Sequence, residues 1–296
     1  MRWILLLLLF FFASVRPLSA ELRADKKNGA LYVQSATTEE VQELFKKYKF
    51  DDYSQMFTTV PRIFLTRLPS DWAQIPESEE KNKTFIRIML PLVLAENEKV
   101  LQERQEIEQL QKKYRTEKKL SDSDIAWLEK KAEKYDVFTR LKDEERTPVL
   151  FKMLLEKVDT MPPSIMVSTA AIYSNWGNSR IALQANSLYL EEVWYQDNGL
   201  KPLDDAEADY RYKIFNTLAE NVASRLLKLN THINYRYIRQ SRLLAREMDR
   251  PLYGPQVAAL MMQDSNLKNI AGLIDYTFSH YKITKTDYLP TLENVQ

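Results

Sequence analysis

The segment from Ile172 to Arg180 has the residue types of a binding or catalytic turn, but it contains no acid. It reads Ile-Tyr-Ser-Asn-Trp-Gly-Asn-Ser-Arg, with two aromatic rings, two amides and a guanidinium. No Asp or Glu occurs anywhere from Thr160 through Leu190. General acid catalysis needs a donor that gives up its proton near neutral pH, and the unperturbed pKa of a tyrosine phenol is about 10. The segment therefore offers groups that bind or brace, and no conventional general acid.

The nearest carboxylates follow in an acidic stretch that lacks a clear hydrophobic period. Its acids are Glu191, Glu192, Asp197, Asp204, Asp205, Glu207 and Asp209. Acidic stretches of this kind are most often solvated loops. The alternative is that Glu191, Glu192 or Asp197 reaches back toward Tyr173 and acts as a relocated acid.

Metal and cofactor chemistry has few residues to draw on. The chain has no cysteine, which excludes zinc sites of the Cys type, and only two histidines, His232 and His280. Both histidines lie in helical patterns, where surface or packing roles are ordinary. We expect no metal site and no cofactor.

The first twenty residues have the pattern of a secretory signal peptide. Arg2 is followed by an apolar run from Ile4 to Phe12, and small residues precede a cut after Ala20. The run is shorter than the ~20 apolar residues that cross a bilayer, so cleavage is favoured over a retained anchor. Cleavage removes two arginines and no acid, which changes the formal net charge from +1 to −1. A near-neutral exported chain without a membrane span is not expected to bind nucleic acid.

The remaining sequence predicts a mainly helical protein. Glycine is scarce, with 5 in 296 residues, and apolar residues recur at helical spacing from Asn82 onward. Residues 21–80 are expected to be an irregular lead-in, with a short strand near Ala30–Val33. A long helix is predicted from about Asn82 to Lys113, and a capping box begins the next helix at Ser121. A helix from Ser164 to Ser174 would place Tyr173 near its C-terminal end.

Four motifs in the same order resemble the bacterial Bax-like glucosaminidase-domain family, a relative of glycoside hydrolase family 73. The family pattern runs P-P-S, then N-E-S-x-W-G-T-S-R-F, then N-N-L-F-G, and a later L-N-L-N-T-H. The corresponding residues here are 162–164, 172–181, 186–190 and 227–232. The resemblance covers roughly residues 58–285. It implies a lysozyme-like α+β fold with at most a small β-hairpin, a domain over 81–290, and its motif half over about 158–290.

The resemblance also implies roles for individual residues. Tyr173 stands where the family has its catalytic glutamate, and Asn178, Ser187 and Leu190 replace the family's Thr, Asn and Gly. Trp176, Gly177 and Arg180 are expected to hold the fold. A retained groove for glycan or a protein partner would be lined by Tyr173, Asn178, Asn186, Tyr189, Trp194 and Tyr195.

These expectations combine into a non-catalytic module of the periplasm or cell envelope. It would associate with peptidoglycan, with an envelope protein complex such as a secretion system, or with both. The alternative is an active peptidoglycan N-acetylglucosaminidase whose acid is Glu191, Glu192 or Asp197.

Overall fold

The computed structural model describes residues 22–138, 143–194, 198–203, 205, 207–250, 252–261, 270–288 and 290–295. Helices dominate the described part, so the prediction of a mainly helical α+β protein is confirmed. The expected signal peptide lies outside the described residues.

The elements follow one another from a strand-rich N-terminal part into a helical bundle. The helices are α1 (Thr38–Lys47), η1 (Tyr53–Phe57), α2 (Glu79–Glu117), α3 (Asp122–Lys134), α4 (Asp143–Lys157), α5 (Pro163–Tyr173), α6 (Arg180–Ala185), α7 (Leu218–Thr231), η2 (Ile233–Tyr235), α8 (Arg236–Glu247), α9 (Gly254–Met261), α10 (Ala271–Tyr281) and η4 (Ile283–Tyr288). The strands are β1 (Arg23–Lys27), β2 (Ala30–Ser35), β3 (Thr59–Pro61), β4 (Ile63–Leu65), β5 (Glu192–Trp194), β6 (Gly199–Leu200), β7 (Tyr210–Lys213) and β8 (Thr291–Glu293).

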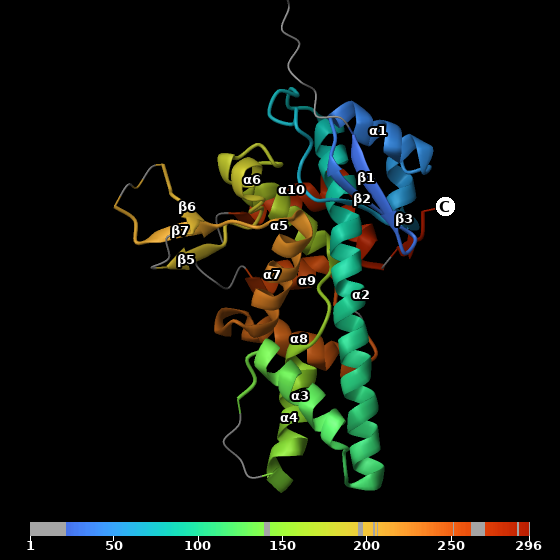
Figure 1. Cartoon of the computed structure of the whole chain (residues 1–296), viewed down its shortest axis with the longest axis vertical. Helices are drawn as coiled ribbons and strands as arrows, with labels where there is room; N and C mark the ends of the chain where they lie inside the picture. Colours follow the sequence, from blue (N-terminus) through green and yellow to red (C-terminus); the bar gives the residue numbers. More distant parts are fainter. Residues whose placement is uncertain are drawn as a thin grey trace, which may run out of the picture.

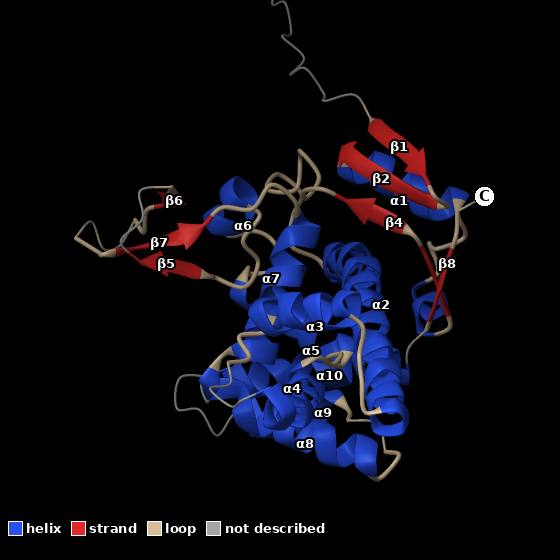
Figure 2. Ribbon diagram, turned by 60° about the horizontal axis from the view of Figure 1, so that its bottom comes forward, coloured by secondary structure: helices blue, strands red, loops and turns tan. Residues whose placement is uncertain are grey.

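Helix α5 lies inside the bundle. Its residues from Pro163 to Ala171 are all buried, and most of them are apolar or small. Such a helix has no polar face for water and must be covered on all sides. The covering elements include α2, α9, α10 and η4, and Figure 2 shows α5 surrounded by helices.

Helix α2 is the longest element and extends along the whole molecule in Figure 1. It exceeds the predicted range 82–113 at both ends, because Ser78 caps its start and Lys118 ends it in a left-handed conformation. Its first half is apolar and buried, from Thr84 to Leu94, and packs against α5 and α7. Its second half is largely polar and lies beside α3 and α4 (Figure 1).

The N-terminal part is more regular than the irregular lead-in that the sequence suggests. Strand β2 pairs antiparallel with β1 and parallel with β4, and Val33 and Leu65 enter the same apolar core as α2. Strand β3 pairs in parallel with β8, so the end of the chain returns to this region. The described strands thus form more than the single small hairpin expected.

A third small sheet projects from the side of the bundle (Figures 1 and 2). Its strand order is β5-β7-β6, and both pairings are antiparallel. It occupies part of the stretch that the sequence presents as an acidic loop. The sheet follows α6 along the chain, and its strand β7 contacts α6.

Helix α5 ends in a turn of unusual backbone geometry. Asn175, Trp176 and Gly177 have φ values of 49°, 55° and 81°, all in the left-handed region. The Ser174 hydroxyl accepts the Gly177 N–H at 2.8 Å, and the indole N–H of Trp72 donates to the Trp176 carbonyl at 3.0 Å. A Cβ on Gly177 would lie 2.7 Å from Leu68 and 2.8 Å from the Trp72 ring nitrogen. This position therefore needs glycine for both its backbone angle and its close packing.

A buried acid, Asp159, ties the start of α5 to three helices. Its carboxylate accepts two hydrogen bonds from Arg246 of α8, and Arg104 of α2 lies 3.6 Å away. Its carbonyl accepts the Asn230 side chain of α7 at 2.9 Å. Burial alone would raise the pKa of Asp159, but the Arg246 hydrogen bond and the charges of Arg242 and Arg104 outweigh it and lower that pKa.

We predict that Asp159→Asn destabilises the fold by about 3–5 kcal/mol at pH 7, because it leaves buried arginines without their carboxylate. A lowered folded-state pKa stabilises the protein above the unfolded pKa of about 3.9, and this contribution disappears as pH falls through the folded value. The difference between wild type and variant in urea unfolding should therefore shrink below about pH 4. A difference that stays constant from pH 7 to pH 3 would contradict this assignment.

We also predict that Gly177→Ala destabilises the protein by at least about 1–3 kcal/mol, through overpacking and the left-handed backbone. Gly272 is the matched control, since a Cβ there meets no atom within 4 Å and the residue lies in α10. Gly272→Ala should be neutral or stabilising by up to ~1 kcal/mol. Equal effects of the two substitutions in thermal unfolding would contradict the steric argument.

Candidate functional site

Tyr173 is the last residue of α5, at the end from which the motif turn begins. Its side chain is partly exposed and packs against the edge of the core. The side chain of Trp176, three residues later, has ring contacts with Phe85 at 5.9 Å and Tyr281 at 5.1 Å between centroids. Trp176 thus anchors the turn to α2 and α10, and both Trp176 and Tyr173 are half-buried.

The side chain of Asn178 accepts a hydrogen bond from a buried lysine. Lys81 is 4% exposed, and its ammonium donates to the Asn178 side-chain oxygen and to the carbonyls of Trp72 and Ile75, each at 2.7 Å. These three acceptors match the three donors of an ammonium group. Burial lowers the pKa of Lys81. One oxygen of the proposed groove residue Asn178 is therefore occupied in joining the turn to the start of α2.

Arg180 and Asn186 connect the turn to the segments around the projecting sheet. Arg180 donates to the Lys201 carbonyl, just beyond β6, and to Gln184. The Asn186 amide donates to the carbonyls of Phe215 and Asn216, at 3.1 and 3.3 Å. Both residues satisfy backbone carbonyls, which fixes the sheet relative to α6.

The structure corrects the expectation that Tyr189 lines a groove. Tyr189 is 3% exposed, and its hydroxyl donates to the Met166 carbonyl of α5 at 3.1 Å. Burial raises its pKa, which Arg225 beside the ring partly opposes. The ring is covered and has no open face for a sugar. Leu190, the next residue, has φ of 51° where the resembled family has glycine, so a side chain occupies a backbone conformation that favours glycine.

The two fallback acids differ sharply in exposure. Glu191 is 6% exposed, and one of its oxygens accepts the Ser224 hydroxyl at 2.7 Å. Its other oxygen is buried and meets no hydrogen-bond donor among the described residues. Glu192 is exposed on β5, where it pairs across the sheet with Tyr212. Glu192 is therefore the acid of this pair that an external molecule can reach.

The expected groove residue Trp194 lies in an aromatic cluster on the projecting sheet, whose other members, Tyr210 and Tyr212, the sequence did not predict. Trp194 is 52% exposed and pairs across the strands with Tyr210, their ring centroids 5.4 Å apart. Tyr210 in turn contacts Tyr212, two residues along β7, at 5.6 Å. Side chains two apart on a strand share a face, so the three rings form one surface. The alternation in Tyr210-Arg211-Tyr212-Lys213 was the available signal. Tyr195 and Asp197 lie outside the described residues.

The site thus combines aromatic faces with hydrogen-bonding groups. Among the described residues, no cluster of three His, Asp or Glu side chains is placed to hold a metal ion. No described helix is both long and apolar enough to cross a bilayer. From Thr160 to Leu190 the motif region presents no carboxylate to a ligand.

Comparison with known proteins gives one informative match. The chain is 28% identical over 184 residues to Protein bax of Escherichia coli (strain K12). The match covers 60% of this chain and spans 61% of the length of that protein. No protein-family model matches the chain, and no solved structure shows a significant match. The similarity supports a Bax-like family for this protein.

Proposed function

We propose that the protein is a non-catalytic, glucosaminidase-like envelope module that binds peptidoglycan. It would act in the periplasm or cell envelope, alone or within an envelope-spanning complex such as a secretion system. The resemblance of its motifs and the similarity to Protein bax support the family part of this proposal.

The observation that carries the proposal is the identity of Tyr173. Glycoside hydrolysis requires a carboxylic acid that protonates the leaving oxygen and a second carboxylate that stabilises or attacks the sugar. Tyr173 ends α5 at the acid position of the resembled family, and its helix and the following turn contain no Asp or Glu. Of the two fallback acids, Glu191 is buried and bound to Ser224, and Glu192 is exposed. Neither occupies position 173, so the acid that the family has there is not replaced within α5 or the turn.

The aromatic surface of the projecting sheet supports the binding part of the proposal. Aromatic rings bury a large apolar area at a low entropic cost, and the apolar faces of sugar rings can stack on them. Trp194 and Tyr210 present such rings beside the polar backbone of short strands. A glycan strand could lie on this surface, beside Glu192, without the glutamate that the resembled family has at position 173.

We predict that the mature protein releases no muropeptides from isolated sacculi, because a tyrosine cannot replace a carboxylic acid as general acid at neutral pH. Restoring the acid with Tyr173→Glu should give activity at least ~10²-fold above wild type if the rest of the groove is intact. Tyr173→Gln is the matched control, as it has the same size as glutamate without the proton donor. Digestion by wild type that is abolished in Glu192→Gln would overturn the proposal and establish a relocated acid.

We further predict that Trp194→Ala and Tyr210→Ala each weaken sedimentation with sacculi by about 2–10-fold, since a lost stacked ring costs ~0.5–1.5 kcal/mol. Tyr237→Ala is the control, because Tyr237 is 50% exposed but lies on α8, away from this sheet. Unchanged sedimentation of both sheet variants would show that the aromatic surface does not bind the glycan.

A further inference from the structure

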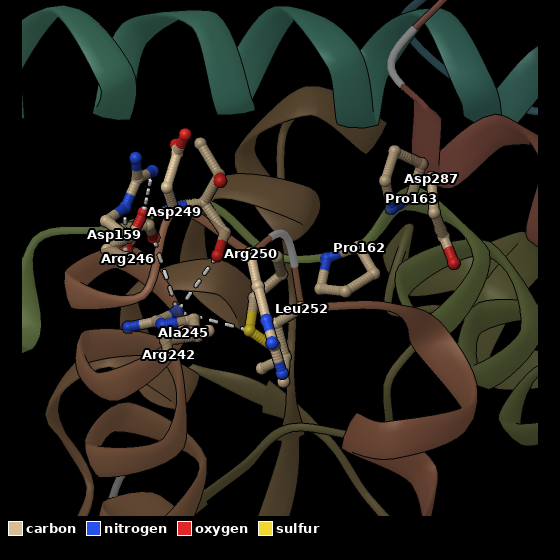
Figure 3. A pocket seen from close by; sticks show the side chains of 12 residues that line it. Asp159, Pro162, Pro163, Arg242, Ala245, Arg246, Asp249, Arg250, Leu252 and Asp287 are labelled. Carbon is tan, nitrogen blue, oxygen red and sulfur yellow. Dashed lines mark hydrogen bonds and ion pairs between the residues drawn. The ribbon is translucent and has the colours of Figure 1, made fainter.

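A pocket lies at the opposite end of α5 from Tyr173. It has a volume of about 300 Å³ and opens between the start of α5 and the C-terminal end of α8. Helix α5 has 11 residues, so at 1.5 Å per residue the two ends are separated by roughly 16 Å. The pocket is therefore separate from the candidate site above, and Figure 3 shows the side chains that line it.

On its α8 side the pocket is lined by a buried cation, Arg242, that is hydrogen-bonded to no carboxylate among the described residues. Arg242 is 3% exposed, and its hydrogen bonds go to backbone carbonyls, such as Thr160 at 3.1 Å, and to the Met161 sulfur. Its Nε–H meets no acceptor among the described residues. Burial lowers the pKa of Arg242 to about 10, so the side chain still carries its charge at neutral pH.

The carboxylate nearest to Arg242 is already shared. Asp159 accepts both hydrogen bonds of Arg246, and Arg104 approaches it from the other side at 3.6 Å. Arg104 also pairs with Glu108 at 2.9 Å. Three arginines thus face two acids, and the charge of Arg242 is left only partly compensated.

Arg250 adds a second uncompensated cation at the mouth. Its side chain is exposed and forms no hydrogen bond or ion pair with any described residue. In Figure 3 this side chain extends into the pocket near Leu252. Two guanidinium groups therefore border one hollow, and the exposed one, Arg250, has its donors to spare.

The other two acids of the lining do not cancel these charges. Asp287 accepts the Ser164 N–H and hydroxyl and the Gly254 N–H, within 2.8–2.9 Å, and lies at the far end of the pocket in Figure 3. It already uses the Ser164 N–H at the start of α5. Asp249 is exposed to water, and in Figure 3 its carboxylate points away from Arg242 and Arg250.

The rest of the pocket wall is apolar. Pro162, Leu252, Ala245 and Met161 line the hollow with apolar side chains. A pocket of this size with apolar walls and convergent donors suits a small molecule whose polar end is anionic. The planar fork of a guanidinium matches the two oxygens of a carboxylate.

We propose that this pocket binds a carboxylate carried on a small apolar body, such as the C-terminal residue of a peptide. The carboxylate accepts hydrogen bonds from Arg250 and is attracted by the buried charge of Arg242, and the apolar body rests on Pro162 and Leu252. The proposal does not depend on Tyr173 or on peptidoglycan binding, because the pocket lies at the other end of α5.

The test is calorimetric titration of the full mature chain, at low salt, with N-acetylleucine and with its neutral amide. We expect the acid to bind at least tenfold more tightly than the amide. Arg250→Gln should weaken binding of the acid by tenfold or more and leave the amide unchanged, since the Arg250 side chain forms no hydrogen bond or ion pair with the described residues. Arg242→Lys keeps the positive charge beside the pocket, and should therefore leave the preference for the acid over the amide in place.

Arg236→Gln is the matched control, because Arg236 is an exposed α8 arginine outside the pocket. Equal affinity for acid and amide, or no binding of either, would overturn the proposal. So would equal losses in Arg236→Gln and Arg250→Gln, which would indicate an unspecific effect of charge. Inorganic phosphate is the third probe, and phosphate binding tighter than that of N-acetylleucine would exclude a carboxylate with an apolar body. Tyr173→Glu should leave all of these affinities unchanged.

Discussion

The complete burial of α5 is the constraint on which the rest of the structure depends. A helix with no polar face must be covered on all sides, and α2, α9, α10 and η4 supply that cover. Only its two ends can meet solvent or polar groups. The C-terminal end presents Tyr173 and the turn held by Lys81, and the N-terminal end lies against Asp159 and the arginines of α8. The candidate site at Tyr173 and the pocket beside the α8 arginines therefore lie at the two ends of one buried apolar helix.

The charges around Asp159 show how an electrostatic requirement of the fold creates a surface property. A buried carboxylate needs a cation, and Arg246 with Arg104 satisfies it. Arg242 is held in the same region by backbone carbonyls, so its charge exceeds what Asp159 can neutralise. Excess positive charge in a partly buried pocket acts more strongly on an anion than the same charge in water. Because backbone carbonyls and not a carboxylate hold Arg242 in the fold, its positive charge remains only partly compensated beside the pocket.

Local sequence signals predicted the elements that depend on neighbouring residues. The capping box at Ser121 and the Ser164–Ser174 helix appear nearly where expected, because caps and helical periods act within a few residues. The pairing of β3 with β8 joins residues more than 200 apart, and no local pattern encodes it. Burial of Tyr189 depends likewise on its contact with Met166 of α5. An aromatic residue after a motif can turn inward or outward, and only tertiary packing decides.

The same distinction explains why the motif can be present without its acid. Gly177 is required by its backbone angle and by the approach of Trp72, and Trp176 packs between Phe85 and Tyr281. Asn178 accepts the third hydrogen bond of the buried Lys81 ammonium, which also donates to the carbonyls of Trp72 and Ile75. None of these contacts involves the side chain of residue 173. These contacts therefore hold the turn without deciding between tyrosine and glutamate at that position, so the surviving motif reports on the architecture.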